Sequence, residues 1–488
     1  MRATKIFYRE FWGATKRADL LATLDQRDRA FEASYKNIAP ALDNRFSLRM
    51  LRQTTAYSSW PTVRELAAEH PLNGPVERRA LALIDTDRAA LRTRMHAYFD
   101  ASKSDAEVAA LHPGLLMIGN GINGPKDRKK LQKRQTFRGT RIKPYPWKPF
   151  DQRWAYLDDI APLFSRPNVA LQVISELPAV TFFVTRDDAD TPDEGPPTYF
   201  TRLICDYDFL RGHARLFPTE LPAAALTAVE GGAAQFAFDY QRPANSRPNL
   251  SRPAVAWLAQ LGLLPTTATA YQVWHHALAV TYSPAWLSEN GESIRQGWPR
   301  IPLPGSADLL AISAQLGAQV AALLDPDVPV PGVTQGTPRP ELASIAVPST
   351  APGATRDWAL TGWGHRTEKG VTMPGRGRTD ERAYAAGEAA AAAQAALLGA
   401  TTRDVWMNGT SFWRNIPDAV WEAHIGGYQV IKKWLSYRDH SILGRALTEA
   451  EVRHVQDTAR RLAALRLMGP DLDASFRACA AAHVPLPA

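Results

Sequence analysis

Apolar residues recur at helical spacings between charged neighbours from the start of the chain to about residue 112. Leu20, Leu21 and Leu24 form one such group. An apolar stripe of this period is typical of helices that pack one face against a core. We therefore predict a helical spacer over residues 1–125.

Short runs rich in β-branched and aromatic residues follow between about residues 145 and 215. VALQVISEL at 169–177, AVTFFVT at 179–185 and TRLICDY at 201–207 are bounded by Pro or by Asp and Gly clusters. That composition predicts strands. Farther along, the apolar run at 309–324 predicts a helix, and we place another helix start at Trp274.

The last third of the chain mixes breaker-rich and helical stretches. Residues 331–382 are rich in Pro and Gly, which predicts a long loop or loosely tied strands. The Ala-rich tract 383–398 can form a helix, although Gly387 weakens it. Thr448 and Glu451 form a capping box ahead of an apolar stripe, which predicts an amphipathic helix. The expected fold class is α+β, with a helical N-terminal spacer and a mixed α/β domain that ends in a capped helix.

Composition narrows the class of protein. The 488 residues are 45% hydrophobic and 22% charged, which suits a globular chain of two or three domains. Cys205 and Cys479 are the only cysteines, so the chain has neither a disulfide framework nor a cysteine-rich zinc module. The N-terminal segment lacks both a signal-peptide core and the ~20-residue apolar run of a membrane span. We expect a cytoplasmic protein with no membrane partner.

The positive charge of the chain is concentrated in one segment. The whole chain has a net charge of 57 − 49 = +8, and residues 126–143 alone hold nine Lys or Arg against Asp127, which also gives +8. Five aromatic residues follow directly: Tyr145, Trp147, Phe150, Trp154 and Tyr156. Cations neutralise phosphates and aromatic faces stack on bases, so the combination favours a nucleic-acid partner. The alternative is a solvated charged loop that leads into a buried strand.

The sequence holds no complete catalytic constellation. It has no P-loop, no GxGxxG turn, no GxSxG elbow and no HExxH motif. The double proline at Gly195-Pro196-Pro197-Thr198 lacks both the Asp or Asn and the aromatic residue of a methyltransferase (D/N)PP(Y/F) loop. His275 and His276 are adjacent on a predicted helix and cannot share one metal ion. We therefore assign no catalytic residue, no metal site and no cofactor to this chain.

Residues 404–438 carry the most distinctive pattern. A helix that begins after Gly426-Gly427 would align Val430, Trp434 and Tyr437 on an apolar face and leave Lys432 and Lys433 on the other side. Glycine amides at that helix start would form an anion site for a DNA phosphate. The alternative is that the two glycines only permit a tight chain crossing.

This segment closely resembles the terminal specificity region of type ISP restriction–modification enzymes and related adenine methyltransferases, which end with a VWE, IGGYQVLKKWL and YR block. Further blocks match in the family's order at 145–153, 298–304 and 444–461. We expect ten residues of these blocks to be structural: Phe150, Asp151, Arg153, Pro299, Arg300, Trp421, Gly426, Gly427, Tyr428 and Trp434.

The resemblance implies a DNA target-recognition module rather than an enzyme on its own. In the family, nuclease, helicase and methyltransferase modules precede this region, and this chain has none of their motifs. The expected partners are therefore double-stranded DNA and a separately encoded methyltransferase, with or without a helicase–nuclease chain; a split gene is the other possibility. S-adenosylmethionine would be bound by the methyltransferase. Residues 1–125 would dock that partner. Residues 126–330 would contain the basic and aromatic segment and the first part of the recognition domain, 331–382 a Pro- and Gly-rich loop region, and 383–488 the C-terminal part of that domain.

The cations of the basic run and of the terminal block are the expected DNA contacts: Lys126, Arg128, Lys129, Lys130, Lys133, Arg134, Arg138, Arg141, Lys143, Lys432, Lys433 and Arg438. Gln429 and Asn408 have side chains that can read adenine, with buried structural roles as the alternative. Two other functions stay open. One is a hydrolase that uses His275 or His276, and the other is a protein that binds RNA or single strands through the basic and aromatic stretch.

Overall fold

The structure is a computed structural model that describes residues 5–11, 15–24, 34–38, 55–119, 121–158, 162–187, 194–223, 245–295, 297–367 and 372–488. Its contacts divide the chain into two units, residues 1–55 and 56–488. The division falls at residue 55 and not at the expected boundary of 125, because the elements after residue 55 share the core of the large unit.

The described residues of the small unit form a helix and a two-stranded sheet. Strand β1 (Ile6–Tyr8) pairs antiparallel with β2 (Lys36–Ile38), and α1 (Lys16–Leu24) lies between them in the chain. Leu20 and Leu21 on α1 are exposed. Leu20 and Leu21, two of the residues that predicted a packed helix, therefore face outward within this unit.

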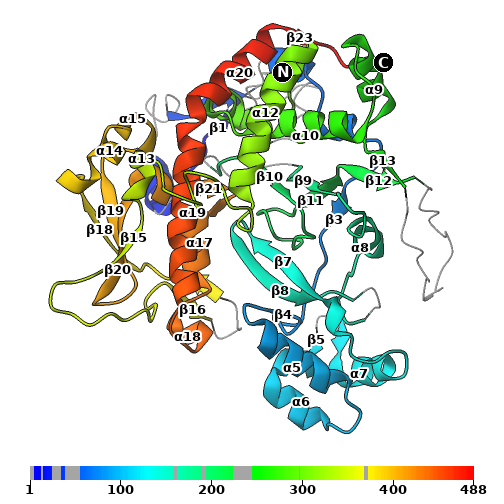
Figure 1. The fold of residues 1–488 in the computed structure, drawn as a ribbon, viewed down its shortest axis with the longest axis vertical. Coiled ribbons are helices and arrows are strands. Elements are labelled where there is room, and N and C mark those ends of the chain that lie inside the picture. The colour runs from blue at the N-terminus through cyan, green and yellow to red at the C-terminus, as the bar shows by residue number, and fades with distance from the viewer. Residues whose placement is uncertain are drawn as a thin grey trace. The chain divides into compact units, whose positions relative to one another are not determined.

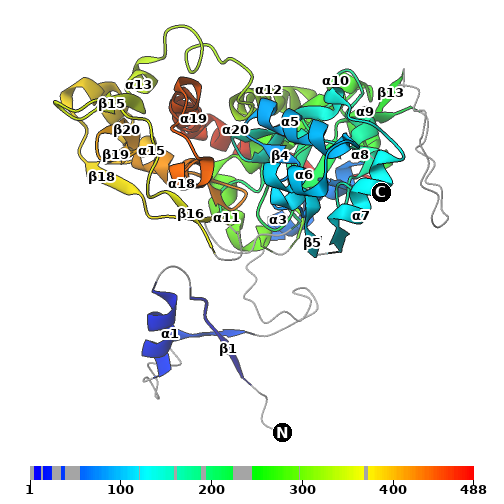
Figure 2. The ribbon, with the colours of Figure 1, turned by 90° about the horizontal axis from the view of Figure 1, so that it is seen from below.

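In the large unit, α5 (Arg88–Phe99), α6 (Asp105–Leu111) and α7 (Gly124–Gln132) pack together at the lower end of Figure 1, which is the end nearest the viewer in Figure 2. Local capping fixes where these helices begin, since Asp87, Ser104 and Asn123 accept hydrogen bonds from the first amides of α5, α6 and α7. The shorter elements of this part are α3 (Thr55–Ser59), α4 (Val63–Leu66), β3 (Leu72–Asn73), β4 (Ile84–Asp85), η1 (Pro113–Leu116), β5 (Ile118–Gly119), β6 (Ile122–Asn123) and η2 (Gly139–Arg141).

Two antiparallel sheets follow at the centre of the unit. One has the order β4-β8-β7, with β7 (Ile142–Lys148) and β8 (Asp151–Tyr156), and the other has the order β10-β9-β11-β3. The second sheet contains β9 (Phe182–Thr185), β10 (Thr198–Thr201) and β11 (Arg215–Pro218), and a separate ribbon joins β12 (Glu220–Pro222) to β13 (Ser246–Pro248).

A layer of helices covers the second sheet. Helix α12 (Ala307–Leu324) packs along α10 (Thr267–Thr281) and also contacts β10, α19 (Glu449–Leu467) and α20 (Gly469–Ala481). The capping box of Thr448 and Glu451 is present at the start of α19, so that prediction is confirmed. The layer is completed by α9 (Arg252–Gln260), α11 (Pro284–Ile294) and a small sheet of β14 (Leu303–Pro304) with β23 (His483–Val484).

Helix α19 runs between this part and a four-stranded antiparallel sheet of order β15-β20-β19-β18 (Figure 1). The strands are β15 (Val347–Thr350), β18 (Arg378–Arg382), β19 (Thr402–Trp406) and β20 (Ser411–Pro417). Around them lie α13 (Pro340–Ala343), η3 (Ala386–Glu388), α14 (Ala389–Ala392), α15 (Ala395–Leu398) and α16 (Asp418–Trp421). The chain then forms β21 (His424–Ile425), β22 (Tyr428–Gln429), α17 (Val430–Ser436) and α18 (His440–Leu443).

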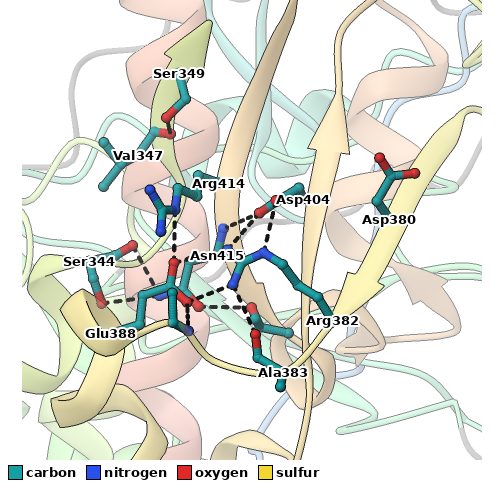
Figure 3. A network of polar contacts seen from close by, with 12 residues as sticks. Ser344, Val347, Ser349, Asp380, Arg382, Ala383, Glu388, Asp404, Arg414 and Asn415 are labelled. Carbon is teal, nitrogen blue, oxygen red and sulfur yellow. Dashed lines mark hydrogen bonds and ion pairs between the residues drawn. The ribbon is translucent and has the colours of Figure 1, made fainter. Parts of the chain in front are cut away.

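A polar network holds this sheet together (Figure 3). The Arg382 guanidinium on β18 pairs with Glu388 at 2.7 Å and with Asp404 on β19 at 2.8 Å. Arg414 on β20 pairs with Glu388 at 2.9 Å, and the backbone N–H of Asn415 donates to Asp404 at 3.0 Å. Ion pairs thereby link three strands to η3, in a region whose alanines bury little apolar surface.

Two strand predictions are wrong, or wrong in part. VALQVISEL contains α8 (Val169–Ile174), because Asn168 caps a helix there and accepts a hydrogen bond from the amide of Leu171. TRLICDY contributes Thr201 alone to β10. Trp274 lies inside α10 rather than at its start, because Thr266 caps that helix two turns earlier.

Among the described residues one helix, α12, is long and apolar enough to cross a membrane by length and composition. Its buried residues include Leu310, Val320 and Leu324, and the helix packs against α10, α19 and α20. The core of this fold therefore accounts for its apolar composition.

Candidate nucleic-acid interface

A buried ion-pair cluster joins two of the matching blocks, 145–153 and 420–438. The Asp151 carboxylate on β8 lies 2.8 Å from the guanidinium of Arg153 and 2.8 Å from that of Arg438, and all three side chains are at most 5% exposed. Burial by itself would raise the pKa of Asp151, but the two guanidinium groups outweigh it and hold that pKa below its usual value. The carboxylate therefore stays charged and fixes the end of α17 on the β7–β8 hairpin.

Aromatic rings surround these charges. The Arg153 guanidinium lies 4.6 Å from the centroid of Tyr437 and 5.2 Å from that of Trp147. The Lys433 ammonium lies 4.9 Å from the centroid of Tyr437 and 5.4 Å from that of Tyr428. Burial lowers the pKa of Lys433. Its charge is thus already engaged by ring faces, whereas Lys432 is half-buried without an ion-pair partner in the described part of the chain.

Arg438 does not face solvent, so its assignment as a DNA contact is wrong. Besides its ion pair with Asp151, its guanidinium lies 4.0 Å from the centroid of the Trp434 ring. Trp434 is buried and stacks on His454 at 5.3 Å. Trp434 and Arg438 are therefore packed together in the core, where the charge of Arg438 is neutralised by Asp151.

The two glycines of the block form a hairpin turn between β21 and β22, with φ values of +54° at Gly426 and +84° at Gly427. Their amides donate to the carbonyl oxygens of Pro196 and Glu194, both at 2.9 Å, and a Cβ on Gly426 would overlap the side chain of Leu210. The predicted anion site is therefore wrong, because both amides are used and α17 begins only at Val430. The tight chain crossing is confirmed.

The remaining structural residues lie in two places. Phe150 is buried at the β7–β8 turn, where its carbonyl oxygen lies 2.8 Å from Nε2 of His454. The block at 298–304 lies elsewhere, against α3 and α4. There the carbonyl of Pro299 accepts from the amide of Val63 at 2.9 Å, and the amide of Arg300 donates to the Tyr57 hydroxyl at 3.2 Å.

Arg128 is buried, so its assignment as a DNA contact is wrong. It points inward from α7, where its Nε donates to the carbonyl of Tyr98 at 2.8 Å and its guanidinium pairs with Asp105 at 2.6 Å. It is 4% exposed. Its other nitrogen donates to the carbonyls of Asp100 and Lys103, both at 2.8 Å, so Arg128 ties α7 to α5 and α6.

The other cations of the run lie outward. Arg128 and Leu131 form the inner face of α7, so the residues between and beyond them face solvent. Arg141 and Lys143 are half-buried as the chain enters β7. The exposed members are Lys126, Lys129, Lys130, Lys133, Arg134 and Arg138.

The aromatic residues after the run do not form a stacking platform. Tyr145, Phe150 and Tyr156 are buried. The two half-buried tryptophans already carry cations, with Arg88 at 4.9 Å from the Trp154 centroid and Lys148 at 4.4 Å from that of Trp147. The basic surface is therefore suited to phosphates more than to unstacked bases.

The two residues considered as adenine readers have structural roles. The Asn408 side chain donates to the carbonyls of Asp357 and Ala359 at 2.9 and 2.8 Å. Gln429 donates from its side-chain amide to the carbonyl of Trp421 at 2.9 Å. Both amides hold turns in place.

The histidines of the hydrolase alternative are part of the packing. His276 is buried, with Nδ1 2.8 Å from the Ser313 hydroxyl and Nε2 2.9 Å from the carbonyl of Pro302. Burial lowers the pKa of His275 and that of His276 to about 4. Both ring nitrogens of His276 are thus engaged by uncharged groups, and the described ranges contain no group of three or more His, Cys, Asp or Glu that could hold a metal ion.

The class of protein follows from the comparison with known families. Residues 72–465 match the family described as the Type ISP C-terminal specificity domain. The chain belongs to this family. A search of curated proteins found no match.

Three solved structures share the fold. A nuclease-deletion mutant of the Type ISP enzyme LlaGI, in complex with a DNA substrate mimic, has a TM-score of 0.53 at 12% identity over 96% of this chain and 32% of its own. The ATP-dependent Type ISP enzyme LlaBIII, bound to DNA, has a TM-score of 0.53 at 11% identity. The match covers 91% of this chain and 25% of LlaBIII. The DrdV–DNA complex has a TM-score of 0.58 at 14% identity, and the match covers 96% of this chain and 43% of the DrdV chain. This chain thus spans less than half the length of each.

We expect Asp151→Asn to lower the free energy of unfolding by about 3–5 kcal/mol, because it leaves two guanidinium groups buried without their counter-charge. Since the pKa of Asp151 is held below its usual value, its stabilisation is present above about pH 4 and is lost as the pH falls further. Urea unfolding at pH 7 measures the loss.

The matched control is Asp380→Asn. That carboxylate also pairs with an arginine at 2.8 Å, but its side chain is 47% exposed. Exposed pairs contribute about 0–1 kcal/mol. Equal losses in the two variants would contradict the structural role of the buried cluster.

Proposed function

We propose that this chain binds duplex DNA and selects the sequence on which a Type ISP restriction–modification enzyme, or a related adenine methyltransferase, acts. The observation that carries the proposal is the family match over residues 72–465. The names of the three structures with this fold each include DNA, which supports the same partner. The exposed cations of α7 and the residues after it provide a surface for it.

The spacing of these cations suits a DNA backbone. Lys126 to Lys133 covers about 10 Å along a helix at about 1.5 Å per residue. One strand of B-DNA places about three phosphates in that length. Lys126, Lys129, Lys130, Lys133, Arg134 and Arg138 would bind them, and such contacts position a protein without reading sequence.

Methyl transfer would belong to a methyltransferase that binds S-adenosylmethionine itself, encoded separately or on the same polypeptide. The support is the sequence, which lacks both a glycine-rich cofactor turn and a (D/N)PP(Y/F) loop. The small unit is the part that we propose docks on it, because Leu20 and Leu21 on α1 are 43% and 50% exposed there.

We expect the purified 488-residue chain to incorporate no methyl groups into DNA, because its sequence has no motif for the cofactor or for a flipped adenine. The measurement is transfer of label from S-adenosylmethionine, with an active Type ISP methyltransferase as the positive control. Incorporation by the pure chain would contradict the proposal.

We expect replacement of Lys129, Lys130, Lys133 and Arg134 by Ala to weaken binding to all duplex sequences alike. The slope of log affinity against log salt should fall by about 0.9 for each phosphate that the variant no longer neutralises. Titration of a labelled duplex at several salt concentrations measures both quantities.

A variant with Ala at Arg252, Arg453, Arg466 and Arg477 is the control, since it removes the same charge from exposed positions on α9, α19 and α20. Equal weakening by the control would mean that total charge, and not the basic run, sets affinity.

Stronger competition by single strands than by duplex would favour the RNA or single-strand alternative.

A further inference from the structure

A short β-ribbon projects from the C-terminal part of the large unit. Strand β16 (Gly364–Arg366) pairs antiparallel with β17 (Thr372–Pro374), in the register His365 opposite Met373 and Arg366 opposite Thr372. It lies in the segment for which the sequence predicts a long loop or loosely tied strands. After β17, the residues Gly375, Arg376 and Gly377 connect the ribbon to β18.

A buried tryptophan anchors the ribbon. Trp363 packs against Trp421 with centroids 5.6 Å apart, and its Nε1 donates to the carbonyl of Trp406 at 2.8 Å. The amides of Trp363 and Gly364 both donate to one carboxylate oxygen of Asp439, at 2.9 and 3.2 Å. The base of the ribbon is thus fixed to β19, α16 and the residue before α18.

The glycines at this base serve close packing. A Cβ on Gly375 would overlap the carbonyl of Gly362, and a Cβ on Gly377 would lie 2.5 Å from ring atoms of Trp363. The amide of Gly377 donates to the carbonyl of Gly362 at 2.9 Å. The glycine-rich composition predicts a flexible loop, but these glycines form a well-packed turn around Trp363.

Both strands of the ribbon carry exposed side chains beyond its base. Consecutive residues of a strand point to opposite faces. His365 and Arg366 are both exposed, and so are Met373 and Pro374 on the other strand. The ribbon thus lies beside α17 and α18 while these four side chains remain exposed to solvent.

The segment is positively charged. Residues 361–378 contain Arg366, Lys369, Arg376 and Arg378 against Glu368, which gives 4 − 1 = +3. Arg378 lies 3.9 Å from the Trp406 centroid and pairs with Asp380 at 2.8 Å, so it is engaged. Arg366 and Arg376 are exposed, and neither has an ion pair or hydrogen bond from its side chain to the rest of the described chain.

Strand β16 and helix α7 both lie in the lower part of Figure 1 and on the lower side of the large unit in Figure 2, with β16 toward the left and α7 toward the right. Electrostatics agrees with this placement. Burial is the main cause that lowers the pKa of His112, the residue after α6, to about 4, and the charges of Arg94 and Arg366 add to it.

We propose that the β16–β17 ribbon enters the major groove of duplex DNA and that Arg366 and Arg376 read base edges there. The inference rests on the proposed function and names the element that selects sequence. A two-stranded ribbon is narrow enough for the major groove, and a guanidinium binds the O6 and N7 acceptors of guanine in bidentate fashion. Met373, which is 44% exposed, offers an apolar contact to a thymine methyl group.

The test is selection from a random duplex pool. The full chain and the Arg366→Ala, Arg376→Ala variant each select binders, and the recovered motifs are compared. We expect the variant to lose preference for guanine at one or two positions, by about 5- to 150-fold for each arginine. The melting temperature should stay unchanged, because neither side chain has a partner in the described part of the fold.

Two further variants separate the possible results. Arg252→Ala, on α9, should keep the full motif, and Lys129→Ala should weaken all duplexes while keeping the motif. If the Arg366→Ala, Arg376→Ala variant selects the same motif with the same preference for guanine, the inference about the ribbon is overturned. The proposed function would still stand in that case. Equal weakening on every sequence also overturns the inference, because the arginines would then contact phosphates. If the unmodified chain selects no motif, the proposed function fails and this inference with it.

Discussion

The Asp151 carboxylate is shared by Arg153, two residues away on the same strand, and by Arg438, which is 287 positions away in sequence. Removing three charges from water is costly, and only mutual attraction and good geometry offset that cost. Once the cluster forms, the β7–β8 hairpin and the end of α17 are fixed relative to each other. Asp439, the next residue, then holds Trp363 and with it the base of the β16–β17 ribbon. The position of the ribbon depends on this buried contact through one short stretch of chain.

The same residue types serve two purposes in this protein, and burial separates them. Arg128 and Lys129 are neighbours in the basic run, yet Arg128 binds four backbone carbonyls of the α5–α6 region while Lys129 faces solvent. Arg438 and Lys433 likewise stand among charges and aromatic rings of the core. Fewer cations are therefore available to a polyanion than the count in the sequence indicates, and the exposed ones include those of α7 and of the ribbon.

Local features could be predicted from the sequence, and contacts between distant segments could not. The capping box of α19 and the apolar period of α12 depend on residues within one or two turns, so both helices were expected where they occur. The strand expected at 169–177 is a helix because Asn168 caps it, a signal that β-branched composition masks. The sequence predicts a helix start at Gly426 and Gly427. In the structure their amides donate to the carbonyls of Pro196 and Glu194, so the glycines lie where two distant chain segments cross. The family blocks contain buried residues such as Asp151 and Trp434. The residues that we propose read bases lie instead in a stretch whose composition predicts a loop.

Duplex DNA that binds as proposed would contact both α7 and the β16–β17 ribbon. Chemical modification of lysines and arginines, with and without a saturating duplex and read by mass spectrometry, tests this most directly. The account predicts that DNA protects Lys129, Lys130 and Lys133 together with Arg366 and Arg376, while Arg252 and Arg477 remain reactive. Protection of Arg252 and Arg477, with Lys129 and Arg376 as reactive as in the free chain, would contradict it.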